Sequence, residues 1–278
     1  MATVTEPSVL PTIELVESDG EPMDSPWHRD AMHLLIEQVR YRMQGCRDYF
    51  VGGNMFIYFN LEQARNRDFR GPDFFYVKGV RYEPFRLYYV VWDEGGKYPD
   101  VIIELLSPTT ADEDLTTKKT IYERVFRTPD YFCYDPETQE LKGWHLVDQV
   151  YQPLQPNERG WLWCGQLGLW LGTWTGLYQG QTDTWLRYYD EQGQVVPLFA
   201  EGEAQLADAA QQRADAARQQ ADAAQQQADA AQQQADAARQ QAGAERKRAE
   251  AAEAELARLR ALLAQPEGQA KQPGNGAE

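Results

Sequence analysis

One carboxylate interrupts a stretch that otherwise has the composition of a buried strand. Glu104 lies within Val101–Leu106, and every other residue of that run is apolar. A charged group in a buried strand is costly unless it is paired, protonated or bound to a cation. Two explanations follow: a structural ion pair with a nearby lysine or arginine, or a site that holds a metal ion.

A second carboxylate favours the metal site. Asp73 follows Gly71-Pro72 and begins the strand-like run Asp73–Val77. If this strand pairs with the Glu104 strand, the two carboxylates converge at one end of a sheet. Converging carboxylates repel each other, and a hard divalent ion, Mg²⁺ or else Mn²⁺, removes that conflict. The backbone carbonyl of Leu105 would supply a further oxygen ligand.

The segment that follows provides a cation. Asp114, Lys118 and Tyr122 recur every four residues within Asp112–Phe126, which predicts a helix with these three residues on one face. Leu115 and Val125 are expected on that side too. The connection from the Glu104 strand is short, so Lys118 can point towards that strand. A cation beside a metal suits a phosphate or an attacking water.

Three segments carry a resemblance to a known family: GPDFFYV, YPDVIIELLSPTT and DLTTKKTIYERVFRTPDYFCYDP. Together they resemble the Uma-type restriction endonuclease family, a bacterial branch of the PD-(D/E)xK nuclease superfamily, over roughly residues 10–190. The resemblance implies a Mg²⁺-dependent endonuclease acting on DNA. It makes Asp73 and Glu104 the metal-binding acids and Lys118 the catalytic lysine. The simplest superfamily pattern has its lysine where this chain has Leu106, and Lys118 fits a migrated position on the following helix.

Other polar residues near these motifs each have two explanations. His28 sits where similar sequences place a histidine at the entry of a helix, and Glu37 is the candidate for an extra acid on that helix. The alternative for His28 is a helix cap or a surface residue. The alternative for Glu37 is a solvated helix position. Tyr122 would orient the lysine or belong to the core, and Asp100 would lie near the metal or act as a cap. Lys119 is the neighbouring alternative to the catalytic lysine, but on a helix it points about 100° away.

The charge balance restricts how nucleic acid could bind. The net charge is −16, and residues 1–200 carry 18 Lys and Arg against 30 Asp and Glu. Such acidity argues against broad attraction to nucleic acid or anionic membranes. Local contacts to phosphate are expected from a basic group: Arg65, Arg67, Arg70, Lys118 and Lys119. The alternative for the three arginines is a solvated loop.

The chain lacks the marks of secretion or membrane insertion. Its three cysteines form no CxxC pair, and the first residues show no basic start followed by an apolar core. No apolar run approaches the length of a membrane span. We therefore expect a cytoplasmic protein without disulfides and without a membrane partner.

Periodicity predicts an α/β or α+β domain, with a restriction-endonuclease-like mixed sheet flanked by helices. An amphipathic helix is expected over Trp27–Met43 after the capping pair Ser25-Pro26. Tyr49–Val51 and Asn54–Phe59 would form a hairpin that turns at Gly52-Gly53. Further strands are expected at 73–77, 87–92, 101–106, 130–134, 141–147 and 150–153, and as several short pieces within 161–189.

The last part of the chain repeats every seven residues from Ala207, in units such as ADAAQQR and ADAARQQ. Its composition predicts one long helix over 201–264, of about 95 Å. The seam of the heptads is alanine until leucines appear near its end. We expect a coiled coil that makes a homodimer or higher oligomer, and the alternative is a single solvated helix. The expected organisation is a loose segment 1–25, a nuclease-like domain 26–200, the helix 201–264 and a disordered tail 265–278.

Two other functions fit the same residues. A non-catalytic interaction protein could keep a nuclease-like fold and oligomerise through its C-terminal helix. The same fold and metal could also act on another phosphoester, in RNA or in a branched structure. An absence of Mg²⁺ binding would favour the non-catalytic interaction protein over a nuclease.

Overall fold

The computed structural model describes residues 15, 25–66, 70–83 and 85–263. The expected loose segment lies outside the described residues, apart from Leu15 and Ser25. The tail from residue 265 and Arg67 also lie outside them. The chain divides into two compact units, Met1–Gln205 and Leu206–Glu278, which are described separately.

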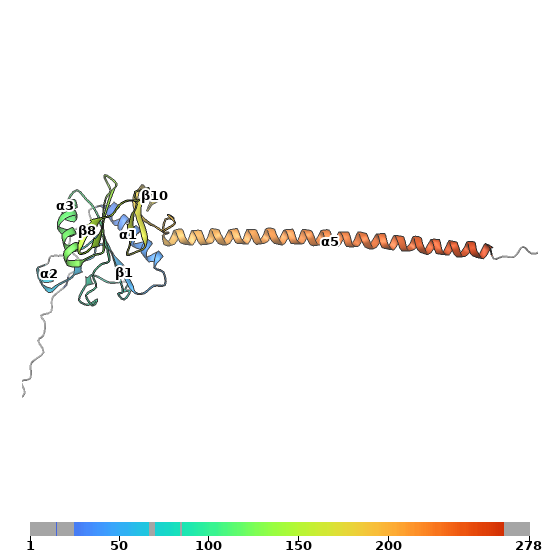
Figure 1. Cartoon of the computed structure of the whole chain (residues 1–278), viewed down its shortest axis with the longest axis horizontal. Coiled ribbons are helices and arrows are strands. Elements are labelled where there is room, and N and C mark those ends of the chain that lie inside the picture. Colours follow the sequence, from blue (N-terminus) through green and yellow to red (C-terminus); the bar gives the residue numbers. More distant parts are fainter. Residues whose placement is uncertain (1–14, 16–24, 67–69, 84, 264–278) are drawn as a thin grey trace, which may run out of the picture. The chain divides into compact units, whose positions relative to one another are not determined.

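A mixed six-stranded sheet forms the centre of the first unit (Figure 1). Its order is β1-β3-β5-β6-β7-β8, and only β5 and β6 are parallel. A parallel pair needs a crossover, and the helix between these two strands provides it. The strands are β1 (Tyr49–Gly52), β3 (Phe74–Lys78), β5 (Val101–Leu105), β6 (Asp130–Asp135), β7 (Glu140–Val147) and β8 (Val150–Pro153).

Different elements cover the two faces of this sheet. One face packs against α1 (Pro26–Arg42) and a three-stranded sheet of β9 (Leu162–Cys164), β10 (Leu169–Tyr178) and β11 (Gln181–Tyr189). Ser25 caps α1 and Pro26 stands in its first turn, as the sequence predicts. The helix between β5 and β6 covers the other face. Successive side chains of β5 alternate between the two cores, which is the period of a strand buried on both faces.

The helix between β5 and β6, here called the central helix, runs from Ala111 to Phe126. It consists of α3 (Ala111–Glu113), η1 (Asp114–Lys118), α4 (Lys119–Ile121) and η2 (Tyr122–Phe126), of which η1 and η2 are π-helical. The expectation that Val125 lies on the buried side is wrong, because Val125 is exposed and Phe126 is buried. A π turn holds more residues than an α turn, so the buried stripe continues from Tyr122 to Phe126.

The expected hairpin at Gly52-Gly53 is wrong. β1 pairs with β3, while β2 (Ile57–Tyr58) leaves this sheet and pairs with β4 (Tyr89–Val90) in parallel. A side chain at Gly53 would collide with the backbone carbonyl of Asp73, so this glycine permits a close approach of two backbones. A short helix, α2 (Leu61–Asn66), follows β2.

The long C-terminal helix is present as α5 (Phe199–Leu263). Within the first unit, its start is held by Glu37, which accepts a hydrogen bond from the Phe199 backbone, and by Glu201, which pairs with the buried Arg187. In the second unit, the described side chains are exposed at nearly every position. The mixed sheet, its flanking helices and the long helix confirm the expected fold class, and the coiled coil stays a prediction. No helix among the described residues combines the length and apolarity needed to cross a membrane.

Candidate active site

Two carboxylates meet where β3 begins and β5 ends. The antiparallel register pairs Phe74 with Ile103, which brings the preceding Asp73 beside Glu104. The Leu105 backbone N–H donates to Asp73 Oδ2 at 2.7 Å, and the Asp73 N–H donates to Glu104 Oε2 at 3.3 Å. Each carboxylate is therefore fixed by the backbone of the other strand, as the pairing predicted from sequence requires.

The central helix brings a lysine to this pair. Lys118 Nζ lies 3.3 Å from Glu104 Oε1 and 2.7 Å from Asp114 Oδ1, which comes from the preceding turn of the helix. Asp114 and Glu104 are almost fully buried, and the Lys118 side chain is 17% exposed. One cation thus serves three neighbouring carboxylates, and the local charge stays negative when all of them are ionised.

Tyr122 supports Glu104 from the next turn of the helix. Its hydroxyl donates to Glu104 Oε1 at 2.8 Å, and its ring is fully buried against Phe126 and Tyr131. These contacts agree with one of the two explanations offered for Tyr122 from sequence. The ring belongs to the core, and the hydroxyl orients the carboxylate rather than the lysine.

Burial controls the protonation of these groups. Burial, with the negative charges of Asp73 and Asp114, raises the pKa of Glu104 to about 8, against the opposing effects of Lys118 and Tyr122. Burial also raises the pKa of Asp73, although the hydrogen bond from Leu105 opposes the shift. Burial alone would lower the pKa of Lys118, but Glu104 and Asp114 raise it above its ordinary value. Lys118 is therefore a permanent cation, whereas the carboxylate pair readily holds a proton.

His28 reaches the same place from α1. Its Nε2 lies 3.1 Å from the backbone carbonyl of Leu105, and its Nδ1 lies 2.8 Å from Ser25 Oγ. The imidazole is buried, so His28 is not a surface residue. With a proton on Nε2, the ring donates to the carbonyl expected to serve as a metal ligand and accepts from the serine.

The remaining candidates lie elsewhere. Lys119 Nζ stands 3.9 Å over the ring of Trp144, a residue of β7. Glu37 binds the start of α5, roughly 13 Å further along α1 than His28. Asp100 accepts from the Lys78 backbone at the opposite end of β5. The structure brings none of these three to the carboxylate pair.

The basic group before β3 is only partly described. Arg65 is exposed at the end of α2, and Arg67 falls outside the described residues. Arg70 is close enough to Tyr122 for its charge to lower the pKa of that hydroxyl, although burial and Glu104 raise it overall.

Asp114 and Gly53 are the residues at the site that sequence reasoning left without a role. The spacing of Asp114 to Lys118 was visible, but a buried i, i+4 pair has the same spacing as a solvated one. Gly53 was interpreted as a turn. Its contact with Asp73 joins residues from β1 and β3 that no local pattern connects.

The donor groups fit a hard divalent cation. Asp73, Glu104 and the Leu105 carbonyl all offer oxygen, the donor that Mg²⁺ and Mn²⁺ prefer, and the surplus of negative charge favours a cation. Asp114 is engaged by Lys118. Within the described ranges, no group of three or more His, Cys, Asp or Glu side chains is arranged to hold a metal ion, so protein ligation would rest on two carboxylates and a carbonyl.

Two facing acids from β3 and β5, with a lysine from the central helix beside them, agree with the site that the resemblance noted from sequence implies. A family model, Uma2, described as "Putative restriction endonuclease", matches residues 11–177, and the chain belongs to this family. The chain is similar to a solved putative nuclease of the DUF820 type from Anabaena variabilis, at 15% identity and a TM-score of 0.39, over 52% of this chain and 76% of that one. No curated protein gives a significant match.

Proposed function

We propose that this chain is a Mg²⁺-dependent endonuclease that hydrolyses phosphodiester bonds of DNA. The observation that carries the proposal is the pair Asp73 and Glu104, held by each other's backbone, with Lys118 Nζ 3.3 Å from Glu104 Oε1. Membership of a nuclease family supports the same class of reaction.

The residues that would hold the ion are Asp73, Glu104 and the backbone carbonyl of Leu105. A bound Mg²⁺, or Mn²⁺ in its place, would polarise the scissile phosphate and lower the pKa of an attacking water. His28 holds the Leu105 carbonyl in its orientation, and Tyr122 holds the Glu104 carboxylate. These contacts fix the donors before substrate arrives, which reduces the cost of organising the site.

Lys118 supplies positive charge where negative charge develops on the phosphate. Asp114 fixes its ammonium group at 2.7 Å, and partial exposure leaves that group accessible from solvent. A charge held in a water-poor site stabilises a transition state more than the same charge in water.

A cleavage assay on a mixed DNA pool tests this function. The purified chain should cut the pool in Mg²⁺ or Mn²⁺, and a chelator should stop the reaction. Glu104→Gln and Lys118→Ala should each abolish cleavage while near-ultraviolet circular dichroism stays unchanged. Lys119→Ala is the matched control, because Lys119 lies next in sequence but packs on Trp144. Cutting by Glu104→Gln or Lys118→Ala at the parent rate would remove that residue from the reaction.

A second candidate function is non-catalytic association through α5. The observation in its favour is the exposure of apolar side chains on an otherwise polar helix, since Leu256 and Leu259 are 53% and 48% exposed. A second copy of the helix would cover them and make a homodimer or higher oligomer. Sedimentation of the full chain, with and without Leu256→Ala and Leu259→Ala, tests this. A monomer at micromolar concentration would contradict it.

A further inference from the structure

A pocket of about 390 Å³ opens beside the carboxylate pair. Its size lies within the roughly 300–1,000 Å³ of small-molecule sites. It is lined by Ser25, Trp27, His28, Leu106, Ser107, Pro108, Thr109, Pro136 and Glu137. We propose that this pocket receives one unpaired nucleobase next to the scissile phosphate, so that the preferred substrate is DNA with single-stranded character. The inference rests on the proposed function and names its substrate class.

The pocket lining adjoins the end of β5 that carries Glu104. Glu104, Leu105 and Leu106 are consecutive, so the chain passes from the acid to the pocket lining in two residues. His28 both lines the pocket and contacts the Leu105 carbonyl at 3.1 Å. A group bound in the pocket would therefore lie within about one nucleotide of a phosphate at the carboxylates.

The lining suits a flat, partly polar ring. Trp27, Leu106 and two prolines supply apolar surface, while hydroxyl groups come from serine and threonine. Trp27 stacks on Tyr134 and Trp185, with ring centroids 6.0 and 5.8 Å apart, so its indole is held in place. Bases commonly bind to proteins by stacking on rigid aromatic side chains, with hydrogen bonds at the ring edge.

The charges of the pocket favour a base over a phosphate. None of the lining residues is Lys or Arg, and the carboxylate among them is Glu137. Both ring nitrogens of His28 already have partners, Ser25 and Leu105. A carboxylate repels phosphate but accepts hydrogen bonds from the amino groups of bases.

An unpaired base fits this site better than a paired one. A base inside a duplex must leave its stack before it can enter a pocket, at a cost of a few kcal/mol. The acidic body also offers little compensation for the dense charge of a duplex. Single strands, frayed ends and flaps avoid the cost of taking a base out of its stack.

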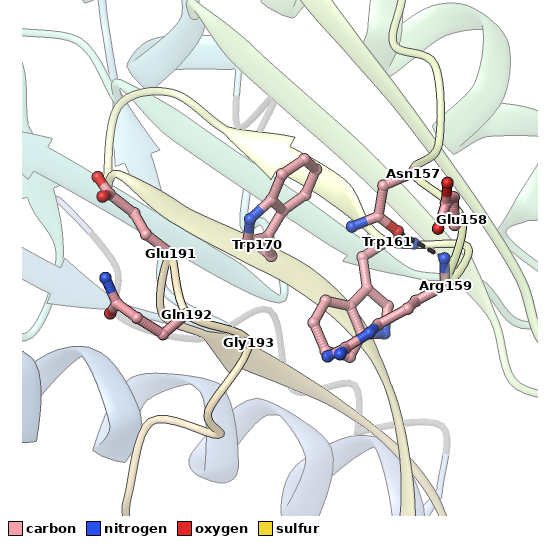
Figure 2. Close-up of a pocket in the computed structure, with 8 residues that line it drawn as sticks. All are labelled: Asn157, Glu158, Arg159, Trp161, Trp170, Glu191, Gln192 and Gly193. Carbon is pink, nitrogen blue, oxygen red and sulfur yellow. Dashed lines mark hydrogen bonds between the residues drawn. The ribbon is translucent and has the colours of Figure 1, made fainter.

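A second pocket, of about 310 Å³, provides an internal control (Figure 2). It is lined by Trp161, Trp170, Arg159 and two glutamates, Glu158 and Glu191, and it shares no lining residue with the first pocket. Figure 2 shows the Arg159 side chain beside the Trp161 ring, and the guanidinium carbon lies 4.9 Å from the centre of that ring. Among the described residues, none that lines this pocket forms a hydrogen bond or ion pair with Asp73, Glu104 or Lys118, so changes there should leave DNA binding unaltered.

Fluorescence anisotropy with labelled DNA in Ca²⁺ tests the inference on the full chain. The probes are a short single strand, the matching duplex and a strand of equal length and charge that lacks bases. We expect the single strand to bind about tenfold tighter than either of the others. Thr109→Phe, which fills the pocket from an exposed position, and Trp27→Leu should each remove about that factor. Gln192→Phe, at an exposed position of the second pocket, and Trp170→Leu, in the same pocket, are the matched controls and should bind as the parent does.

Equal affinity for the single strand and the base-free strand would overturn the inference, and so would a duplex that binds as tightly as the single strand. If Trp27→Leu does not fold, Thr109→Phe decides, and its binding at the parent level overturns the inference. Cleavage is scored separately. Duplex cleavage that needs Glu104 but tolerates Thr109→Phe would leave the nuclease proposal standing and reject the pocket. If the chain cleaves no DNA but its affinity depends on the bases, the pocket inference stands and the nuclease proposal is rejected.

Discussion

The Glu104 carboxylate accepts a hydrogen bond from the backbone of Asp73, the residue whose own carboxylate accepts one from Leu105. Two strands thus hold two carboxyl groups close together, and a single lysine, Lys118, cannot neutralise both of them when they are ionised. The arrangement is unfavourable without a proton or a cation.

The metal-free fold should lose stability as pH rises through the ionisation of Glu104. Its pKa lies at about 8 in the folded chain, against an ordinary value of 4.5. The folded chain therefore binds this proton more tightly than the unfolded chain. The bound proton's contribution to the stability of the fold is fully present below pH 4.5 and is lost as pH rises towards about 8. Unfolding in denaturant, followed by tryptophan fluorescence with a chelator present, measures this, since all eight tryptophans lie before residue 200.

Glu104→Gln should flatten this dependence on pH and gain stability relative to the parent as pH rises. Glu113→Gln, at an exposed position of the central helix, is the matched control and should keep the slope of the parent. A parent slope that survives in Glu104→Gln would show that another group holds the proton.

Tyr122→Phe should weaken metal binding by about tenfold, because the hydroxyl orients Glu104 and groups that position a ligand affect affinity by about 10–100-fold. It should also cost about 1 kcal/mol of stability, as for one buried hydrogen bond. Tyr151→Phe is the control, since that buried hydroxyl donates to the Thr128 carbonyl instead. It should lose similar stability but keep its affinity for metal. Equal affinities in the two variants would limit Tyr122 to a structural role.

Gly53→Ala should impair cleavage, although Gly53 carries none of the site's chemical groups. The added methyl group would collide with the Asp73 carbonyl and with Met32, which forces the start of β3 to move. Overpacking of this kind costs about 1–3 kcal/mol, and we expect cleavage to fall at least tenfold. Gly165→Ala meets only ordinary contacts and serves as the control. Unchanged cleavage in Gly53→Ala would mean that Asp73 tolerates displacement.

A chain that ends at Gln205 should fold with the stability of the full chain, because the compact first unit ends there. It keeps Glu201, whose carboxylate binds the buried Arg187 at 2.7 Å. In that shortened chain, Glu201→Ala should cost about 2 kcal/mol or more, since it leaves a buried guanidinium without its acid. Glu203→Ala, at an exposed position of the same turn, should cost little. Similar unfolding midpoints for the two variants would contradict this account.

Much of the fold was predictable because its signals are local. The apolar runs before and after the central helix predicted β5 and β6, and the runs 141–147 and 150–153 predicted the neighbouring strands β7 and β8. Gly52-Gly53 misled because glycine marks both tight turns and close contacts between backbones. The pairing of β1 with β3 joins segments about 25 residues apart, which no local pattern reveals.

The site was predictable where it violated a local rule. Glu104 stood out as a charge in a buried strand, and Lys118 followed from helical spacing. His28 was not predictable as a buried partner of Leu105, because 77 residues separate them and a histidine at a helix start has the pattern of a cap. The π turns of the central helix were not predictable from sequence either, because their hydrogen bonding depends on packing rather than on composition.

Calorimetric titration of Mn²⁺ and Mg²⁺ into the full chain tests the central claim most directly. The parent should bind the ion in a saturable step that releases protons near neutral pH, because the ion displaces the proton of the Asp73 and Glu104 pair. Asp73→Asn should reduce affinity by at least tenfold, while Asp100→Asn, at the other end of β5, should bind as the parent does. Absence of binding by the parent, or equal binding by the parent and Asp73→Asn, would contradict the proposed metal site.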